Sequence, residues 1–154
     1  MVRAFKEGGS DFDIMAAGTA MRFLTAYLAQ SEGMWTITGS ERMRHRPIRL
    51  LVDALRSLGA RIDYIGEEGF PPLRIYGKTL EGGRLMLSAG VSSQYISALL
   101  MVAPYMREGL VLSLVGELIS KPYIMMTLSM MREWGVGSEW NGNCLLYTSD
   151  AADD

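Results

Sequence analysis

A short basic segment is the first place where this sequence could do chemistry. The stretch SERMRHRP, Ser40 to Pro47, holds three arginines and the only histidine of the chain. An apolar run, IRLLVDALRSL, follows at once with the periodicity of a helix. Three interpretations compete: a patch that binds nucleic acid, a solvated surface turn, or a pocket for a small anion.

The starts of the other predicted helices have similar chemistry. Small, hydroxylated or basic residues precede each one: Ala17-Gly18-Thr19, Ser92-Ser93-Gln94 and Ser120-Lys121-Pro122. A helix N-terminus carries free backbone N–H groups and the positive end of the helix dipole, so it favours a bound anion. Glycine lets a ligand approach the backbone, and the arginine fork matches carboxylate or phosphate. Together these features indicate a ligand with more than one anionic group.

Each of these residues, taken alone, also has a purely structural explanation. Hydroxyl side chains at three of the starts are ordinary helix N-caps: Thr19, Ser92 and Ser120. Arg44 and His45 are interpreted as solvated turn residues, since a lone histidine is a poor metal ligand. Arg42 and Arg46 could instead form structural ion pairs. The acidic residues available for such pairs are Asp13, Glu41 and Glu117.

The composition excludes several classes of protein. With 154 residues, 49% of them hydrophobic, the chain is long enough for one globular domain with a real core. Its longest apolar stretch, Ala98 to Pro104, is too short to span a bilayer. No signal peptide is visible in the first residues. We therefore expect a cytoplasmic protein without a membrane partner.

The last eleven residues, Cys144 to Asp154, break from the preceding pattern. They resemble the translated read-through of a sequencing adapter, so we exclude them from the fold prediction; a natural acidic tail is the alternative. This exclusion removes the only cysteine, so the remaining sequence can form no disulfide, thiolate nucleophile or cysteine metal site. Three aspartates leave too, which moves the formal net charge from −2 to +1. A near-neutral chain argues against a nucleic-acid partner.

Helical and strand-like segments alternate along the chain. Helical periodicity runs from Thr19 to Gly33, Pro47 to Gly59, Ser92 to Ala103 and Pro122 to Gly135. The apolar face that we expect to be buried on the fourth helix comprises Tyr123, Met126, Met130 and Trp134. The strand-like runs are Trp35–Thr38, Ala60–Ile65, Leu73–Tyr76, Arg84–Ser88, Leu110–Val115 and Val136–Trp140.

The second half of the chain repeats the first at an offset of 74 to 76 residues. Arg46-Pro47 matches Lys121-Pro122, and Leu58-Gly59-Ala60 matches Trp134-Gly135-Val136. This period is longer than that of helical solenoids. Chance similarity between amphipathic helices is the alternative, but a duplicated α/β module explains the offsets better. We predict two copies of one unit.

Four ordered strings between Asp13 and Val136 resemble the N-terminal domain of the EPSP synthase (3-phosphoshikimate 1-carboxyvinyltransferase) family. They are AAGTAMRFLTA, ITGSERMRHRPIRLLVDALRSLGA, VSSQYISALLMVAP and GELISKPYIMMTLSMMREWGV. The resemblance implies an α/β fold of repeated βαβαββ units, the α-β prism of enolpyruvate transferases. About two of the three units of one domain would be present. Residues 1–143 would then be a partial N-terminal domain, and residues 144–154 a non-native tail.

The resemblance also implies an activity. The family transfers the enolpyruvyl group of phosphoenolpyruvate to the 5-hydroxyl of shikimate 3-phosphate without a metal or organic cofactor, on the pathway to chorismate and the aromatic amino acids. By matching motif positions, the residues that bind phosphoenolpyruvate are Gly18, Arg42 and Gln94. Those that bind shikimate 3-phosphate are Ser92, Ser93, Gln94 and Ser120. The supporting residues are Thr19, Arg22 and Tyr123.

Some family features are absent from the sequence. Many members carry Asn at the position of Ala16 and an acidic residue at that of Met125. The family's first-strand Lys-Ser and its C-terminal domain, which holds the acid–base groups, have no counterpart. We therefore expect an internal fragment of a larger, monomeric bacterial enzyme, with no turnover by this chain alone. Two alternatives remain: the related UDP-N-acetylglucosamine enolpyruvyl transferase, which typically uses a loop cysteine that is missing before Cys144, and a non-catalytic anion-binding module.

Overall fold

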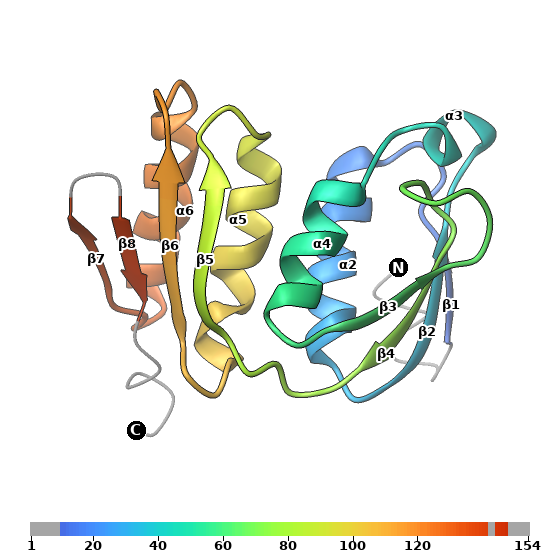
Figure 1. Ribbon diagram of the computed structural model, residues 1–154, viewed down its shortest axis with the longest axis horizontal. Helices are drawn as coiled ribbons and strands as arrows, with labels where there is room; N and C mark the ends of the chain where they lie inside the picture. Colours follow the sequence, from blue (N-terminus) through green and yellow to red (C-terminus); the bar gives the residue numbers. More distant parts are fainter. Residues whose placement is uncertain (1–9, 142–143, 148–154) are drawn as a thin grey trace. The chain divides into compact units, whose positions relative to one another are not determined.

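The computed structural model describes residues 10–141 and 144–147, and the chain divides into two compact units (Figure 1). Unit 1 comprises Met1–Thr79, and unit 2 comprises Leu80–Asp154. Each unit has a four-stranded sheet of its own. Within the described ranges, no helix is long and apolar enough to cross a membrane.

Unit 1 is a mixed sheet with helices on one face. Its elements are β1 (Asp11–Asp13), α2 (Gly18–Gln30), β2 (Gly33–Thr38), α3 (Glu41–Arg44), α4 (Arg49–Ser57), β3 (Arg61–Tyr64) and β4 (Leu73–Gly77). The strand order is β1-β2-β4-β3, in which β1 is parallel to β2 while β4 is antiparallel to β2 and β3. Helices α2 and α4 lie on the same face of this sheet (Figure 1).

The core of unit 1 lies between that face and the two long helices. The largest fully buried side chains come from both layers: Met21, Leu28, Ile37, Leu51, Leu55, Ile62, Leu73 and Ile75. On the strands the buried residues alternate with exposed ones, as a half-buried sheet requires. Burial of an apolar side chain of this size stabilises the fold by about 1.5–3 kcal/mol. The two helices are therefore held firmly, and with them the loops at their N-termini.

Unit 2 is built in the same way. Its elements are β5 (Gly83–Ser88), α5 (Ser93–Val102), the 3-10 helix η1 (Ala103–Tyr105), β6 (Leu110–Val115), α6 (Lys121–Glu133), β7 (Ser138–Asn141) and β8 (Cys144–Tyr147). The strand order is β5-β6-β8-β7, with β5 parallel to β6 and β8 antiparallel to β6 and β7. Helices α5 and α6 pack together, and the hydroxyls of Ser97 and Thr127 lie 2.9 Å apart.

The two units have the same topology. Setting aside the short α3 and η1, each reads βαβαββ, and the two sheets have equivalent strand orders and directions. The order helix, strand, helix, strand occurs from α2 to β3 and occurs again from α5 to β7, as the sequence offset predicts. The predicted duplication is confirmed at the level of topology.

The exclusion of Cys144 to Asp154 from the fold prediction is wrong in part, because Cys144–Tyr147 form strand β8. It begins at Cys144 and pairs with both β6 and β7, for example Leu112 with Leu145 and Trp140 with Leu145. Without β8, the edge of β6 opposite β5 would leave its backbone N–H and C=O groups unpaired. Backbone pairing depends little on which side chains are present, so the unusual sequence does not prevent it. The non-native origin of residues 144–154 stays a prediction.

Several predicted element boundaries also change. Helix α2 starts at Gly18 with Ala17 at its N-cap, so the capping role given to Thr19 is wrong. Ser92 is confirmed as an N-cap, because its side chain accepts a hydrogen bond of 3.3 Å from the Gln94 backbone N–H. Ser120 occupies the N-cap of α6 but makes no side-chain capping bond. Strand β1, with only three residues, was missed because it is too short to show alternation.

The buried face predicted for α6 is wrong. Its four residues are exposed, with accessible fractions of 63% for Tyr123, 56% for Met126, 57% for Met130 and 85% for Trp134. The buried residues of α6 form a second stripe at helical spacing: Ile124, Leu128 and Met131. Both stripes are apolar, so periodicity alone cannot decide which one packs against α5 and the sheet. Unit 2 thus presents an uncovered apolar surface on α6.

Candidate anion-binding site

The basic segment lines a pocket in unit 1. A cavity of about 430 Å³ is bounded by Ala16, Ser40, Arg42, Met43 and Arg46. Met43 is buried and anchors α3, while the Ser40 hydroxyl accepts a hydrogen bond of 3.3 Å from the Met43 backbone N–H. The Arg46 backbone N–H donates to the Met43 carbonyl at 3.0 Å, which keeps Arg46 in the turn that follows α3. The two guanidinium groups therefore belong to one well-anchored turn.

Neither pocket arginine has a counter-charge within the described part of the chain. The ion pairs found there are Arg49–Glu68, Arg56–Asp53 and Arg107–Glu81. The structure does not support the ion pairs considered from the sequence for Arg42 and Arg46. Both side chains are exposed. Two adjacent cations without a partner make the pocket suitable for an anion.

Backbone hydrogen bonds hold the pocket loops together. Strands β1 and β2 are parallel, so the loops after both strands leave the same edge of the sheet. The Ile14 N–H donates to the Thr38 carbonyl at 3.0 Å, and the Ser40 N–H donates to the Met15 carbonyl at 2.8 Å. The start of α2 therefore lies beside the turn that carries Arg42.

Gly18, the first residue of α2, lies against two arginines. The Arg22 Nη1 donates a hydrogen bond of 2.8 Å to the Gly18 carbonyl, and Arg22 is 7% exposed. A Cβ atom added at Gly18 would overlap the Arg46 Nη1 atom and come within 3.0 Å of the Arg22 Nη1. The structure thus brings together three residues predicted for the site, Gly18, Arg22 and Arg42, and adds Arg46. Thr19 is exposed on the first turn of the same helix.

The predicted residues of unit 2 occupy the equivalent edge of its own sheet. Strands β5 and β6 are parallel, and the Ala89 N–H donates to the Val115 carbonyl at 2.8 Å. Ser92, Ser93 and Gln94 form the start of α5 after β5, and Ser120 forms the start of α6 after β6. Within the described residues, the hydroxyl protons of these three serines have no hydrogen-bond acceptor.

Tyr123 lies in the first turn of α6 and is exposed. Its backbone N–H donates to the Ser120 carbonyl at 3.1 Å. In each unit, the predicted polar residues therefore lie where two parallel strands are followed by two helices. Among the described residues, the guanidinium of Arg42 has no ion-pair partner and the hydroxyls of Ser92, Ser93 and Ser120 have no acceptor.

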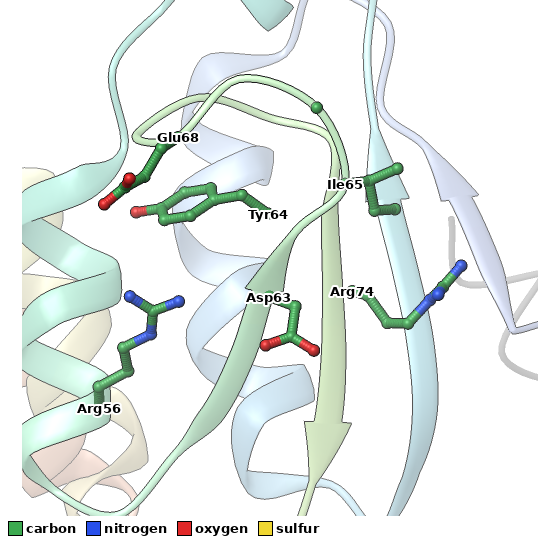
Figure 2. Close-up of a pocket in the computed structure, with 7 residues that line it drawn as sticks. Arg56, Asp63, Tyr64, Ile65, Glu68 and Arg74 are labelled. Carbon is green, nitrogen blue, oxygen red and sulfur yellow. The ribbon is translucent and has the colours of Figure 1, made fainter.

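Sequence reasoning missed a second pocket of unit 1, shown in Figure 2. It measures about 620 Å³ and is lined by Arg56, Asp63, Tyr64, Ile65, Gly66, Glu68 and Arg74. Figure 2 shows the Tyr64 ring extending toward the side of Arg56 and Glu68, away from Ile65 and Arg74. No sequence signal marks it, since its charges are scattered over a helix, two strands and a loop.

Tyr64 is the unusual residue of this second pocket. Its hydroxyl is buried and has no hydrogen-bond partner among the described residues. Burial raises the pKa of Tyr64, and the nearby Arg56 guanidinium opposes this shift in part. Arg56 itself lies 5.2 Å from the centre of the Tyr64 ring and donates from Nε to the Ile62 carbonyl at 3.1 Å. The pocket has mixed charge and no excess of cations.

Comparisons with known proteins agree on one family. The model of the family described as EPSP synthase (3-phosphoshikimate 1-carboxyvinyltransferase) matches residues 2–144. A 3-phosphoshikimate 1-carboxyvinyltransferase from Bacteroides fragilis is 55% identical over 143 residues, covering 93% of this chain and 35% of that protein. The protein of the same name from Pseudoalteromonas atlantica is 50% identical over 132 residues, covering 86% of this chain and 30% of that protein.

A solved structure shows the same fold. The EPSP synthase from Acinetobacter baumannii superposes with a TM-score of 0.77 at 26% identity, covering 90% of this chain and 30% of that one. The chain thus spans about a third of the length of the relatives it matches.

Proposed function

The chain belongs to the EPSP synthase family, and from that premise we propose that the full-length protein transfers the enolpyruvyl group of phosphoenolpyruvate to the 5-hydroxyl of shikimate 3-phosphate. The match of residues 2–144 to the family is the observation that carries this proposal. The reaction forms a bond between the 5-oxygen and C2 of phosphoenolpyruvate while C3 gains a proton. The C–O bond to phosphate then breaks and C3 loses a proton, which releases phosphate and leaves the enolpyruvyl ether.

Unit 1 supplies the phosphoenolpyruvate contacts. Arg42 is exposed, lines the pocket and has no ion-pair partner within the described ranges, so its guanidinium is available for a carboxylate or phosphate. The backbone N–H of Gly18 opens α2 and adds a donor at the positive end of the helix dipole. Arg22 supports the site by holding the Gly18 carbonyl, and Thr19 supports it from the first helical turn.

Unit 2 supplies the shikimate 3-phosphate contacts. Ser92 accepts its capping bond through oxygen, so its hydroxyl proton is still available for a phosphate oxygen. Ser93 and Ser120 offer hydroxyl donors at two helix starts, where the dipole favours a bound anion. The amide of Gln94 serves both substrates, and Tyr123 supports the start of α6.

These groups bind substrates, and they do not transfer protons. Hydroxyls, an amide, a backbone N–H and guanidinium groups serve here as hydrogen-bond donors, whereas general acid–base catalysis requires positioned groups that exchange protons with the substrate. The reaction needs one proton taken from the 5-hydroxyl and one given to C3 in the addition, and one removed from C3 in the elimination. We assign those transfers to the rest of the full-length protein. We therefore expect no turnover from the 154-residue chain alone.

A chimaera tests the proposal. Residues 2–144 replace the matching segment of the Bacteroides fragilis relative, and phosphate release is measured with phosphoenolpyruvate and either shikimate 3-phosphate or UDP-N-acetylglucosamine. We expect turnover with shikimate 3-phosphate only, and none from the isolated chain. Turnover with the nucleotide sugar would reassign the enzyme. A folded chimaera that binds phosphoenolpyruvate and shikimate 3-phosphate but releases no phosphate with either acceptor would indicate a non-catalytic anion-binding module.

A further inference from the structure

A pair of hydroxyl groups joins the two helices of unit 2. Ser97 on α5 is 5% exposed, and its Oγ lies 2.9 Å from the Oγ1 of Thr127 on α6. The Thr127 hydroxyl in turn donates a hydrogen bond of 3.2 Å to the Tyr123 carbonyl. A threonine hydroxyl has one proton, so Ser97 must be the donor in its bond to Thr127. The hydrogen bonds therefore run in one direction, from α5 to the first turn of α6.

This series of hydrogen bonds connects the two helix starts that carry the proposed shikimate 3-phosphate ligands. Ser97 lies one turn after Ser93, the first residue of α5. The Tyr123 N–H donates to the carbonyl of Ser120, the N-cap of α6, at 3.1 Å. Because β5 and β6 are parallel, both starts lie at the same edge of the sheet. The hydroxyl pair therefore fixes α5 against α6 close behind these two starts.

The fold alone does not require polar residues at this place. Unit 1 has the same topology, and the offset of 74 residues matches Ser97 with Phe23. The offsets of 75 and 76 residues match Thr127 with Val52 and Leu51, which are buried. Apolar contacts have no preferred direction, whereas a buried hydroxyl loses its hydrogen bond when the helices shift. Unit 2 thus has a directional contact between its helices where unit 1 has apolar side chains.

We propose that Ser97 and Thr127 are positioning residues for shikimate 3-phosphate: their hydrogen bond holds the starts of α5 and α6 at the separation that this one ligand requires. The inference rests on the proposed function for the identity of the ligand. Neither residue lies at a helix start, and we assign neither a contact with the substrate. Ser92, Ser93 and Ser120 then donate to the ligand without a prior shift of their helices, and such preorganisation increases affinity.

Substitutions at Thr127 in the chimaera test the positioning role. Thr127→Val keeps the shape of the side chain and removes both of its hydrogen bonds, so the Michaelis constant for shikimate 3-phosphate should rise about three- to tenfold. The Michaelis constant for phosphoenolpyruvate and the kcat with both substrates saturating should stay within about twofold, because bound shikimate 3-phosphate itself holds the two helix starts together. Thr127→Ser restores the hydroxyl and should recover the affinity.

Thr25→Val is the matched control for loss of a threonine hydroxyl. The buried Thr25 hydroxyl donates to the Met21 carbonyl at 2.6 Å within α2, in the same way that Thr127 bonds within α6. Its removal should lower the midpoint of urea denaturation and leave the Michaelis constant for shikimate 3-phosphate unchanged. Equal Michaelis constants in Thr25→Val and Thr127→Val would overturn the positioning role.

The double variant with Ser97→Ala and Thr127→Val separates positioning from stability. Neither hydroxyl of the pair is then left buried without a partner, so the urea midpoint should return close to that of the unsubstituted chimaera. The affinity for shikimate 3-phosphate, measured by isothermal titration calorimetry, should stay as low as in Thr127→Val, because the directional contact is still absent. Recovery of the affinity together with the stability would overturn the proposal, since the pair would then act through stability only.

The same measurements distinguish failure of this proposal from failure of the proposed function. A chimaera that binds shikimate 3-phosphate but does not turn it over contradicts the proposed function, and the calorimetric affinities of the variants still decide the role of the hydroxyl pair. A chimaera that does not bind shikimate 3-phosphate contradicts both.

Discussion

The Nη1 atom of Arg22 donates a hydrogen bond of 2.8 Å to the carbonyl oxygen of Gly18, one turn earlier in α2. Gly18 is the first residue of α2, and this bond adds a side-chain donor to a carbonyl of the first helical turn. Arg22 provides that bond from a buried position, where solvent does not compete for its donors. The geometry of the pocket at Gly18 therefore depends on a side chain that lies beneath it.

Replacing Arg22 tests this dependence. Arg22→Met keeps much of the buried volume and removes the hydrogen bond to Gly18, which should destabilise the chain by about 1.5–3 kcal/mol. Urea denaturation followed by circular dichroism measures the change. Arg44→Met, at an exposed position of the same unit, should stay within about 0.5 kcal/mol of the unsubstituted chain. Equal stability of the two variants would mean that the Arg22 bond is not needed.

Arg42→Ala should raise the Michaelis constant for phosphoenolpyruvate in the chimaera and leave the binding of shikimate 3-phosphate nearly unchanged. The loss of a charge-assisted contact of about 1.5–3 kcal/mol corresponds to a change of about 10- to 150-fold. Steady-state phosphate release at varied phosphoenolpyruvate measures it. An unchanged Michaelis constant would remove Arg42 from the site.

Tyr64 should make the chain less stable at alkaline pH. Because burial raises its pKa in the folded state, the unfolded chain loses this proton first as the pH rises through about 10. The unfolded state then binds fewer protons than the folded one, so the free energy of unfolding falls as pH increases above that value. Tyr64→Phe removes this pH-dependent loss of stability. It also removes a buried hydroxyl that has no hydrogen-bond partner among the described residues.

Urea denaturation at pH 8 and pH 10.5 measures the effect of Tyr64→Phe. The variant should be equal or slightly more stable at pH 8, and its advantage should grow at pH 10.5. Tyr76→Phe, on strand β4 of the same sheet, is the control for general effects of removing a phenol hydroxyl. A constant difference between Tyr64→Phe and the unsubstituted chain at both pH values would contradict the prediction.

The uncovered face of α6 should cause self-association of the chain. Met130→Gln together with Trp134→Glu should lower the association measured by sedimentation velocity, because both residues are more than half exposed. The free energy of unfolding should change by about 0.5 kcal/mol or less. Leu128→Ala, on the buried stripe of the same helix, should instead cost about 2–5 kcal/mol. The reverse pattern would show that the exposed stripe is the packed one.

The long amphipathic helices and the duplicated topology were predictable, because periodicity and a constant offset are properties of the sequence itself. The position of Arg46 was not. Its contact with Gly18 joins residues 28 positions apart through two loops, and it depends on the parallel pairing of β1 with β2. From the segment SERMRHRP alone, Arg42 and Arg46 are equally good candidates for structural ion pairs. Only the folded arrangement shows that both face one pocket.

The α6 error has a different origin. Tyr123, Met126, Met130 and Trp134 follow helical spacing as well as the buried stripe does, and apolar spacing carries no information on which neighbour is present. Strand β8 was missed for the opposite reason. Its backbone completes a sheet whatever its side chains are, so an unusual composition does not exclude it.

No described strand is shared between the two sheets, and the chain passes from one unit to the other at Thr79–Leu80. Recombination that inserts or deletes the DNA for one whole unit at this junction therefore preserves every strand pairing of the unit that is kept. A deletion that begins inside one unit and ends at a non-equivalent position of the other would instead leave a strand without its partner. Unequal crossing-over at this junction thus yields chains with more or fewer units in which every unit keeps its complete four-stranded sheet.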